Sequence, residues 1–123
     1  MTLKRRFFSA VLFSICVNSV AAQTPQVTRA EIDMLLKKLQ ISGCQFNRNG
    51  TWYTSAEAQS HLSKKLEYFE KKGMINTTED FIKFAASSSS TSGKAYQVKC
   101  GNEAAVESNN WLNNQLKTLR AGK

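Results

Sequence analysis

Apolar residues recur along the chain at the three- and four-residue spacing of amphipathic helices, in four separate stretches. We expect helices over about residues 28–42, 54–72, 77–86 and 108–120, with their charged side chains away from the apolar side. The apolar side of the first stretch is formed by Ile32, Leu35, Leu36 and Leu39. Gly43 and Gly73 follow the first two stretches, where glycine can end a helix in the left-handed conformation.

Short polar motifs predict where these helices begin. Thr28–Glu31 and Thr54–Glu57 each have the spacing of a capping box, in which the threonine and glutamate side chains satisfy backbone amides at a helix start. The third helix follows a run of capping and acidic residues at 76–80, and the sequence leaves the choice of cap open. We expect Ser108 to cap the last helix.

Two shorter stretches favour β-strands. Residues 96–100 alternate between apolar and polar side chains, as in a strand with one buried face. Residues 44–46 form a second candidate strand, and the strong turn dipeptide Asn49-Gly50 follows it. The expected fold class is therefore α+β and predominantly helical, with about four helices around a short two-stranded antiparallel ribbon.

The first 22 residues follow a different pattern, that of a secretory signal peptide. Basic residues at 4–6 precede an apolar run at 7–17 that is too short to span a bilayer stably. Small residues at 20–22 are typical of a cleavage site, so residues 23–123 would form the mature protein as a single domain. We expect a cleaved signal peptide and a periplasmic location, with an uncleaved membrane anchor as the alternative.

Loss of the signal peptide would change the charge of the chain. The whole sequence has 17 Lys and Arg against 9 Asp and Glu, and three of the basic residues lie at 4–6. The mature chain would keep 14 basic residues and a net charge of +5. This modest charge predicts no nucleic-acid partner. The expected partner is an envelope protein or an anionic envelope polymer, unless the basic face meets only water. We expect no membrane span after cleavage.

Cys44 and Cys100 are the cysteines that would remain, because Cys16 lies in the signal peptide. In an oxidising compartment an isolated pair favours a disulfide bond. A metal site would need more ligands than this pair supplies, and His61 is the one histidine of the sequence. We therefore expect a disulfide between Cys44 and Cys100, no metal and no cofactor.

The sequence has few features of an enzyme. It contains no HExxH or CxxC motif, and Ser92-Gly93-Lys94 lacks the upstream glycine and the following Ser or Thr of a nucleotide-binding P-loop. A hydrolase could use a serine of this segment with Lys94 or His61, although no S-x-x-K motif is present. We expect no enzymatic activity, and the serine hydrolase is the alternative.

The polar segment at 87–94 is the candidate for a binding site. Its serine hydroxyls, the Gly93 backbone and the Lys94 ammonium could form an anion-binding nest, or the segment could be a flexible polar connector. Arg48 in the predicted turn could be a solvated charge. His61, at the edge of an apolar helix face, could be a hydrogen-bonded boundary residue.

Two blocks of residues form a pattern that goes beyond composition. The first block is Arg48-Asn49-Gly50 with Glu57-Ala58, His61-Leu62 and Lys65-Leu66. The second is Thr78-Glu79 and Phe81-Ile82, then Ala86 to Ser90, Gly93-Lys94, Tyr96 and Val98-Lys99. Together these blocks resemble the YfeK-like family of bacterial periplasmic proteins, a domain of unknown function. The resemblance covers about residues 32–99 and implies a small secreted protein without an assigned reaction.

Because the resemblance includes Arg48, His61 and the serine segment, we interpret these residues as a site. The candidate ligand- or partner-binding residues are Arg48, His61, Ser89, Ser90, Ser92, Gly93, Lys94 and Tyr96. The first hypothesis is a non-enzymatic binding module that holds an anionic group of an envelope polymer or protein.

A local resemblance provides an alternative function. Ser92-Gly93-Lys94-Ala95-Tyr96 is similar to the S-G-x-x-Y motif of periplasmic lysozyme inhibitors, which place such a loop in a lysozyme cleft. Those inhibitors are β-barrels, whereas this chain is predicted to be mainly helical. The alternative is an inhibitor or immunity protein against a cell-wall hydrolase.

Overall fold

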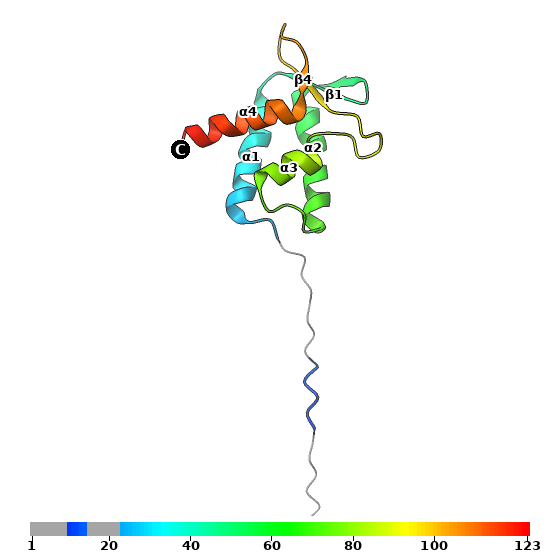
Figure 1. The fold of residues 1–123 in the computed structure, drawn as a ribbon, viewed down its shortest axis with the longest axis vertical. Helices are drawn as coiled ribbons and strands as arrows, with labels where there is room; N and C mark the ends of the chain where they lie inside the picture. The colour runs from blue at the N-terminus through cyan, green and yellow to red at the C-terminus, as the bar shows by residue number, and fades with distance from the viewer. Residues whose placement is uncertain (1–9, 15–22) are drawn as a thin grey trace, which may run out of the picture.

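The computed structural model describes residues 10–14 and 23–123, so most of the predicted signal peptide lies outside the described residues. From Gln23 onward the chain forms helices and short strands around one hydrophobic core (Figure 1). The elements are α1 (Gln26–Ile41), β1 (Gln45–Arg48), β2 (Thr51–Tyr53), α2 (Ser55–Lys71), α3 (Thr78–Ala85), β3 (Gln97–Lys99), β4 (Val106–Glu107) and α4 (Ser108–Ala121). The predicted α+β, predominantly helical fold is confirmed. Within the described part of the chain, none of the helices is long and apolar enough to cross a membrane.

The helix starts follow the sequence in two cases. Thr54 and Glu57 form the predicted capping box of α2, and Thr77 forms a second one with Asp80 at the start of α3. In each box the threonine hydroxyl accepts a backbone N–H while the acidic side chain accepts the amide of the capping residue. These helices therefore begin where local polar chemistry places them.

The predicted starts of the other two helices are wrong by one or more residues. Helix α1 begins at Gln26, two residues before Thr28, because Pro25 supplies the backbone angle that precedes a helix. The Thr28 hydroxyl instead donates to the carbonyl of Asn76. Ser108 is the first residue of α4, and its buried hydroxyl donates to the carbonyl of Ala86. Both hydroxyls therefore bond to a backbone carbonyl of another segment and do not cap their own helix.

The sheet contains the predicted antiparallel pair and is wider than predicted. Its strand order is β2-β1-β3-β4, with every neighbouring pair antiparallel. Strand β1 pairs with β3 and places Phe46 opposite Val98. Strand β2 joins the other edge of β1 through a tight turn in which Asn49 and Gly50 have φ values of 53° and 84°. Strand β4 is only two residues long, so no alternating pattern in the sequence could reveal it.

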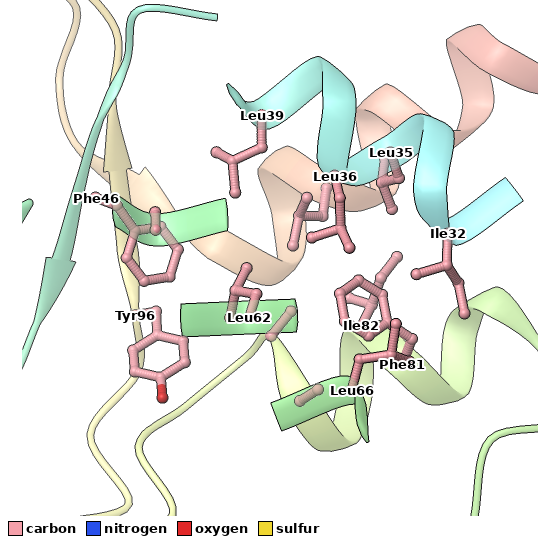
Figure 2. Close-up of a cluster of buried hydrophobic side chains, with 14 of the residues drawn as sticks. Ile32, Leu35, Leu36, Leu39, Phe46, Leu62, Leu66, Phe81, Ile82 and Tyr96 are labelled. Carbon is pink, nitrogen blue, oxygen red and sulfur yellow. The ribbon is translucent and has the colours of Figure 1, made fainter. Parts of the chain in front are cut away.

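The core fills the space between the helices and one face of the sheet, as Figure 2 shows. Helices α1 and α2 pack side by side, and α3 and α4 close the cluster from the other sides (Figure 1). The fully buried side chains with the largest volumes are Tyr96, Phe46, Phe81, Ile32, Leu35, Leu39, Leu62, Leu66, Ile75 and Leu112. The predicted disulfide between Cys44 and Cys100 is present and ties the start of β1 to the end of β3.

Candidate functional site

A small open pocket lies where the β1–β2 turn, α2 and the serine-rich segment meet. Its volume is about 130 Å³. The residues that line it are Arg48, Asn49, His61, Ser89, Ser90, Thr91 and Tyr96. We call this the Arg48 pocket. All its lining side chains carry polar groups, so the Arg48 pocket differs from the hydrophobic cavities that bind apolar ligands.

One wall of the Arg48 pocket is a hairpin formed by residues 88–95, which we call the serine hairpin. An antiparallel bridge joins Ser88 to Ala95, and the amide of Ser89 donates to the carbonyl of Lys94 at 2.9 Å. The amide of Gly93 donates back to the carbonyl of Ser89, also at 2.9 Å. Gly93 has a φ of 71°, which a residue with a side chain adopts at a cost. The segment is therefore a closed hairpin and not an open connector.

The hydroxyl of Ser89 organises the interior of the serine hairpin. Ser89 is buried, and its oxygen lies 3.4 Å from the amides of both Thr91 and Ser92. The side chain of Asn49 donates to the same oxygen at 3.2 Å, and its carbonyl accepts from the Ser92 hydroxyl at 2.5 Å. Asn49 thus fastens the β1–β2 turn to the hairpin, although these segments are 40 residues apart in the chain.

Arg48 and His61 form the floor of the pocket. A guanidinium nitrogen of Arg48 lies 2.8 Å from Nδ1 of His61 and 3.3 Å from Nε2. The guanidinium carbon is 5.6 Å from the centre of the Tyr53 ring, within cation–π range. Because a guanidinium can only donate, the ring nitrogen that it bonds to must accept, and Nδ1 is the nearer of the two.

Tyr96 connects the floor of the pocket to the core. Its ring is buried against Phe46, with ring centres 5.0 Å apart, and its hydroxyl points away from the apolar cluster (Figure 2). Nε2 of His61 is 3.2 Å from this hydroxyl, and Nζ of Lys65 is 3.1 Å from it. Lys65 also donates to the carbonyl of Ser88 at 2.8 Å and so anchors the base of the hairpin.

The charges around the pocket are positive and have no carboxylate partner. The ion pairs found among residues 23–123 involve Arg29, Arg120 and Lys123, and neither Arg48 nor Lys65 takes part in one. No group of three His, Cys, Asp or Glu side chains suited to a metal ion occurs in the described residues. The pocket therefore has an excess of positive charge that the described part of the protein does not neutralise.

Burial and, to a smaller extent, this charge shift the pKa values of the pocket side chains. Burial lowers the pKa of His61 to about 4, and the charges of Arg48, Lys65 and Lys64 act in the same direction. Burial, followed by the charge of Arg48, lowers the pKa of Lys65 to about 8. Burial raises the pKa of Tyr96. Near neutral pH, His61 is therefore neutral while Lys65 is mostly charged.

The structure brings together five of the eight candidate site residues from the sequence. Arg48, His61, Ser89, Ser90 and Tyr96 line the pocket. Ser92 and Gly93 belong to the serine hairpin but do not line the pocket, and their hydrogen bonds maintain the shape of the hairpin. Lys94 is exposed and also does not line the pocket, although its backbone closes the hairpin.

Sequence reasoning missed three side chains of this region: Asn49, Thr91 and Lys65. Lys65 follows His61 by four residues, so helical periodicity alone puts them on one face of α2. Asn49 stands beside Arg48 in the first block of the family resemblance, and Thr91 lies inside the polar segment at 87–94, so their positions were in view, but nothing in the sequence indicates that the two meet. Helical spacing could have identified Lys65, whereas the proximity of Asn49 and Thr91 depends on how the turn and the hairpin pack.

The fold and the pocket define a small, disulfide-bonded α+β domain with a cationic polar pocket. The chain matches the model of a family of unknown function (DUF5329) over residues 26–120, and it belongs to that family. The match agrees with the expectation of a domain of unknown function, while the YfeK-like name itself stays a prediction. No curated protein and no solved structure matches the chain.

Proposed function

We propose that this protein is a non-enzymatic binding module whose Arg48 pocket holds an anionic group of an envelope polymer or an envelope protein. One observation supports this most directly. Within residues 23–123, Arg48 lies in a hydroxyl-lined pocket and pairs with no carboxylate, whereas Arg29 and Arg120, the other arginines of that range, both do. A guanidinium that no carboxylate neutralises is well suited to bind an oxyanion from outside the protein.

The contacts of His61 and Lys65 favour binding over hydrolysis. Both ring nitrogens of His61 already have partners, Arg48 and the Tyr96 hydroxyl. Lys65 donates to Tyr96 and to the carbonyl of Ser88. A serine nucleophile needs a base within hydrogen-bond reach of its hydroxyl. The groups that could act as bases here instead shape the pocket.

The proposed location is the periplasm, after removal of residues 1–22. The signal-like sequence of that segment supports this location. The disulfide between Cys44 and Cys100 is a second, independent support, because such bonds persist in oxidising compartments. An envelope ligand follows from this location.

The local likeness to lysozyme inhibitors gains no support from the geometry. The tyrosine of the S-G-x-x-Y motif is Tyr96, whose side chain is only 1% exposed and packs against Phe46. Ser92 and Gly93 are exposed, but a buried tyrosine does not reach into the cleft of a partner. We therefore develop only the anion-binding proposal.

The proposal predicts that one arginine decides retention on envelope material. We compare the secreted protein with its Arg48→Ala and Lys94→Ala variants by co-sedimentation with purified cell-wall sacculi and by capture on an envelope-protein fraction. Both substitutions remove one positive charge, but only Arg48 lines the pocket. We expect Arg48→Ala to weaken retention by about 10- to 100-fold, since hydrogen bonds to charged groups contribute about 1.5–3 kcal/mol.

The control separates the pocket from the net charge. Lys94→Ala should stay within about twofold of the parent, because exposed charges contribute little to a specific contact. Equal losses in both variants would show that general charge attracts the polymer. Retention of Arg48→Ala at the parent level would overturn the proposal.

A further inference from the structure

We infer that the Arg48 pocket takes a doubly charged tetrahedral oxyanion, of the phosphoryl or sulfuryl type, and that His61 takes up a proton when this anion binds. The inference rests on the proposed function and specifies the ligand of the same pocket. It comes from the direction of the donors, from the hydrogen bonds of His61 and from the charges that face it.

The donors of the pocket come from three separate elements. Arg48 reaches it from β1, Tyr96 contributes its hydroxyl from beside β3, and Ser90 and Thr91 face it from the serine hairpin. A planar carboxylate presents its two oxygens in one plane, and a single guanidinium can satisfy both. Donors that surround a pocket from several sides are better matched by the oxygens of a tetrahedral group. Its volume of about 130 Å³ accommodates one such group, and its open side lets the rest of a larger ligand extend outward.

The contacts of His61 favour one tautomer. Nδ1 is the ring nitrogen nearest to the Arg48 guanidinium, at 2.8 Å, while Nε2 lies 3.3 Å from the same guanidinium nitrogen and 3.2 Å from the Tyr96 hydroxyl. The tautomer with its proton on Nε2 lets Nδ1 accept from Arg48 and lets the Tyr96 oxygen accept from His61 and Lys65. In this tautomer the Tyr96 hydroxyl hydrogen can donate to a ligand.

An oxyanion competes with His61 for Arg48. When the guanidinium turns to the anion, Nδ1 loses its donor and faces a doubly negative group. The anion offsets two of the three positive charges around the ring, those of Arg48, Lys64 and Lys65, and protonated Nδ1 can donate a hydrogen bond to the anion. The imidazolium would stabilise the second negative charge, which Arg48 alone does not neutralise.

Burial and the neighbouring positive charges oppose this proton, so the anion must offset them. The charged and titratable groups that face the ring are Arg48, Lys64, Lys65 and Tyr96. Glu57 lies four residues before His61 on α2, but its carboxylate accepts from the amide and the hydroxyl of Thr54 in the capping box. The anion would therefore supply the negative charge that its surroundings lack.

The sign of the pH dependence follows from proton linkage. Burial and the nearby positive charges hold the pKa of His61 at about 4, and a bound dianion raises it. Between these two pKa values, binding consumes up to one proton, so affinity rises up to about tenfold for each unit by which the pH falls. Lys65 has a pKa of about 8, so measurements at pH 7 and below keep it mostly charged.

Sulfate is the probe, because it stays doubly charged between pH 5 and pH 7. Calorimetric titration of the secreted protein should show sulfate binding at least tenfold tighter at pH 5 than at pH 7. In the His61→Gln variant, which keeps an acceptor but cannot gain the charge, affinity should vary less than twofold over this range. Acetate at pH 7 should bind at least tenfold more weakly than sulfate.

A direct measurement on the parent protein avoids any folding defect of the variant. His61 is the one histidine in the sequence, so its ring proton resonance reports the site without ambiguity. Saturating sulfate should raise the pKa of His61 from about 4 to above 6. An unchanged pKa, or sulfate affinity that does not vary with pH, would overturn the inference.

Titrations with other anions separate failure of the inference from failure of the proposed function. If acetate binds as tightly as sulfate and Arg48→Ala abolishes both, the pocket binds anions but the tetrahedral class is wrong. If no anion binds, both proposals fail. Inorganic phosphate, glycerol 3-phosphate and vesicles of phosphatidic acid in phosphatidylcholine distinguish a free anion, a small ester and a lipid headgroup as its source. Tighter binding of any of the three than of acetate supports the inference.

Discussion

Arg120 lies between two carboxylates, with its guanidinium 2.8 Å from Glu31 and 2.5 Å from Glu79. Arg48 instead faces the neutral ring of His61. The first arrangement neutralises charge within the molecule and stabilises the folded state. The second leaves charge available to a ligand. The partners of the two arginines, not their residue type, separate a structural role from a binding role.

Glu31 is one of the two carboxylates that pair with Arg120. Its side chain is 11% exposed and accepts hydrogen bonds from Arg120 and from the Thr78 hydroxyl. The hydrogen bond from Arg120 is the main reason that the pKa of Glu31 falls to about 2. A lowered carboxylate pKa means that the unfolded chain binds more protons between pH 4.5 and pH 2. The stabilisation is therefore complete above pH 4.5 and is lost as the pH falls towards 2.

We predict that Glu31→Gln lowers the free energy of unfolding by about 2 kcal/mol at pH 7, because it removes a charged hydrogen-bond acceptor from a nearly buried position. At pH 2 the Glu31 carboxylate is about half protonated in the folded protein and protonated in the unfolded chain, so little of its stabilisation remains and the two proteins should differ by less than about 0.5 kcal/mol. Urea unfolding at both pH values measures this difference.

Asp33→Asn is the matched control for this prediction. Asp33 lies on the same helix, but its side chain is 57% exposed and pairs only with Arg29, one turn away. This substitution should change the free energy of unfolding by less than about 0.5 kcal/mol. A gap between Glu31→Gln and the parent that stays equal at pH 7 and pH 2 would contradict the role assigned to Glu31.

At the scale of elements, short-range chemistry and tertiary contacts divide the helices into two groups. The starts of α2 and α3 are fixed by threonines that cap their own helix, Thr54 and Thr77. The hydroxyls of Thr28 and Ser108 leave their helices and bond to distant carbonyls. A capping motif is informative only where no neighbouring element competes for its hydroxyl.

The serine hairpin depends on a single buried hydroxyl. We predict that Ser89→Ala speeds hydrogen exchange at the amides of Thr91 and Ser92 by about tenfold, because both lose the oxygen that lies 3.4 Å away. The free energy of unfolding should fall by about 1 kcal/mol, since the Asn49 side chain also loses an acceptor.

Ser90→Ala provides the comparison. Ser90 is the next residue, is exposed, and makes no side-chain hydrogen bond within the described residues. Its substitution should leave amide exchange in the hairpin unchanged within about twofold. Equal exchange rates in both variants and the parent would show that the Ser89 hydroxyl does not hold the hairpin together.

At the scale of the whole molecule, the disulfide closes the chain segment that contains all the pocket residues. Cys44 and Cys100 are 56 residues apart, and every residue that lines the pocket lies between them, from Arg48 to Tyr96. The bond also joins the two central strands at the end of their pairing. The disulfide therefore limits the unfolded ensemble of the same chain segment that builds the site.

We predict that replacing both cysteines with alanine lowers the free energy of unfolding by about 2–4 kcal/mol, since a loop of this length loses much of its freedom when it is closed. Urea unfolding with and without reductant measures the effect. Reductant should destabilise the parent by a similar amount and leave the alanine variant unchanged. A parent that resists full reduction without loss of stability would contradict this prediction.

Much of the architecture could be predicted because it depends on local patterns. Helical periodicity located all the helices of residues 23–123, and alternation located β3. The site was predictable only in part. His61 lies on a helix edge as predicted, whereas Arg48, predicted in a turn, is the last residue of β1. No sequence pattern states that these two positions face one another across 13 residues. Lys94 belongs to the serine hairpin but does not line the pocket, because composition cannot tell which side of a hairpin a side chain occupies.

The sequence by itself determined the helices, the pairing of β1 with β3, and the disulfide. Each follows from spacing, turn chemistry or the count of cysteines, and these act over short distances or without alternatives. Only the tertiary structure decided that Asn49 holds the serine hairpin, that Lys65 lies against the Tyr96 ring, and that Arg48 pairs with no carboxylate of residues 23–123. These features depend on how elements pack, because a charge is satisfied or left available only by the side chains that the fold brings beside it.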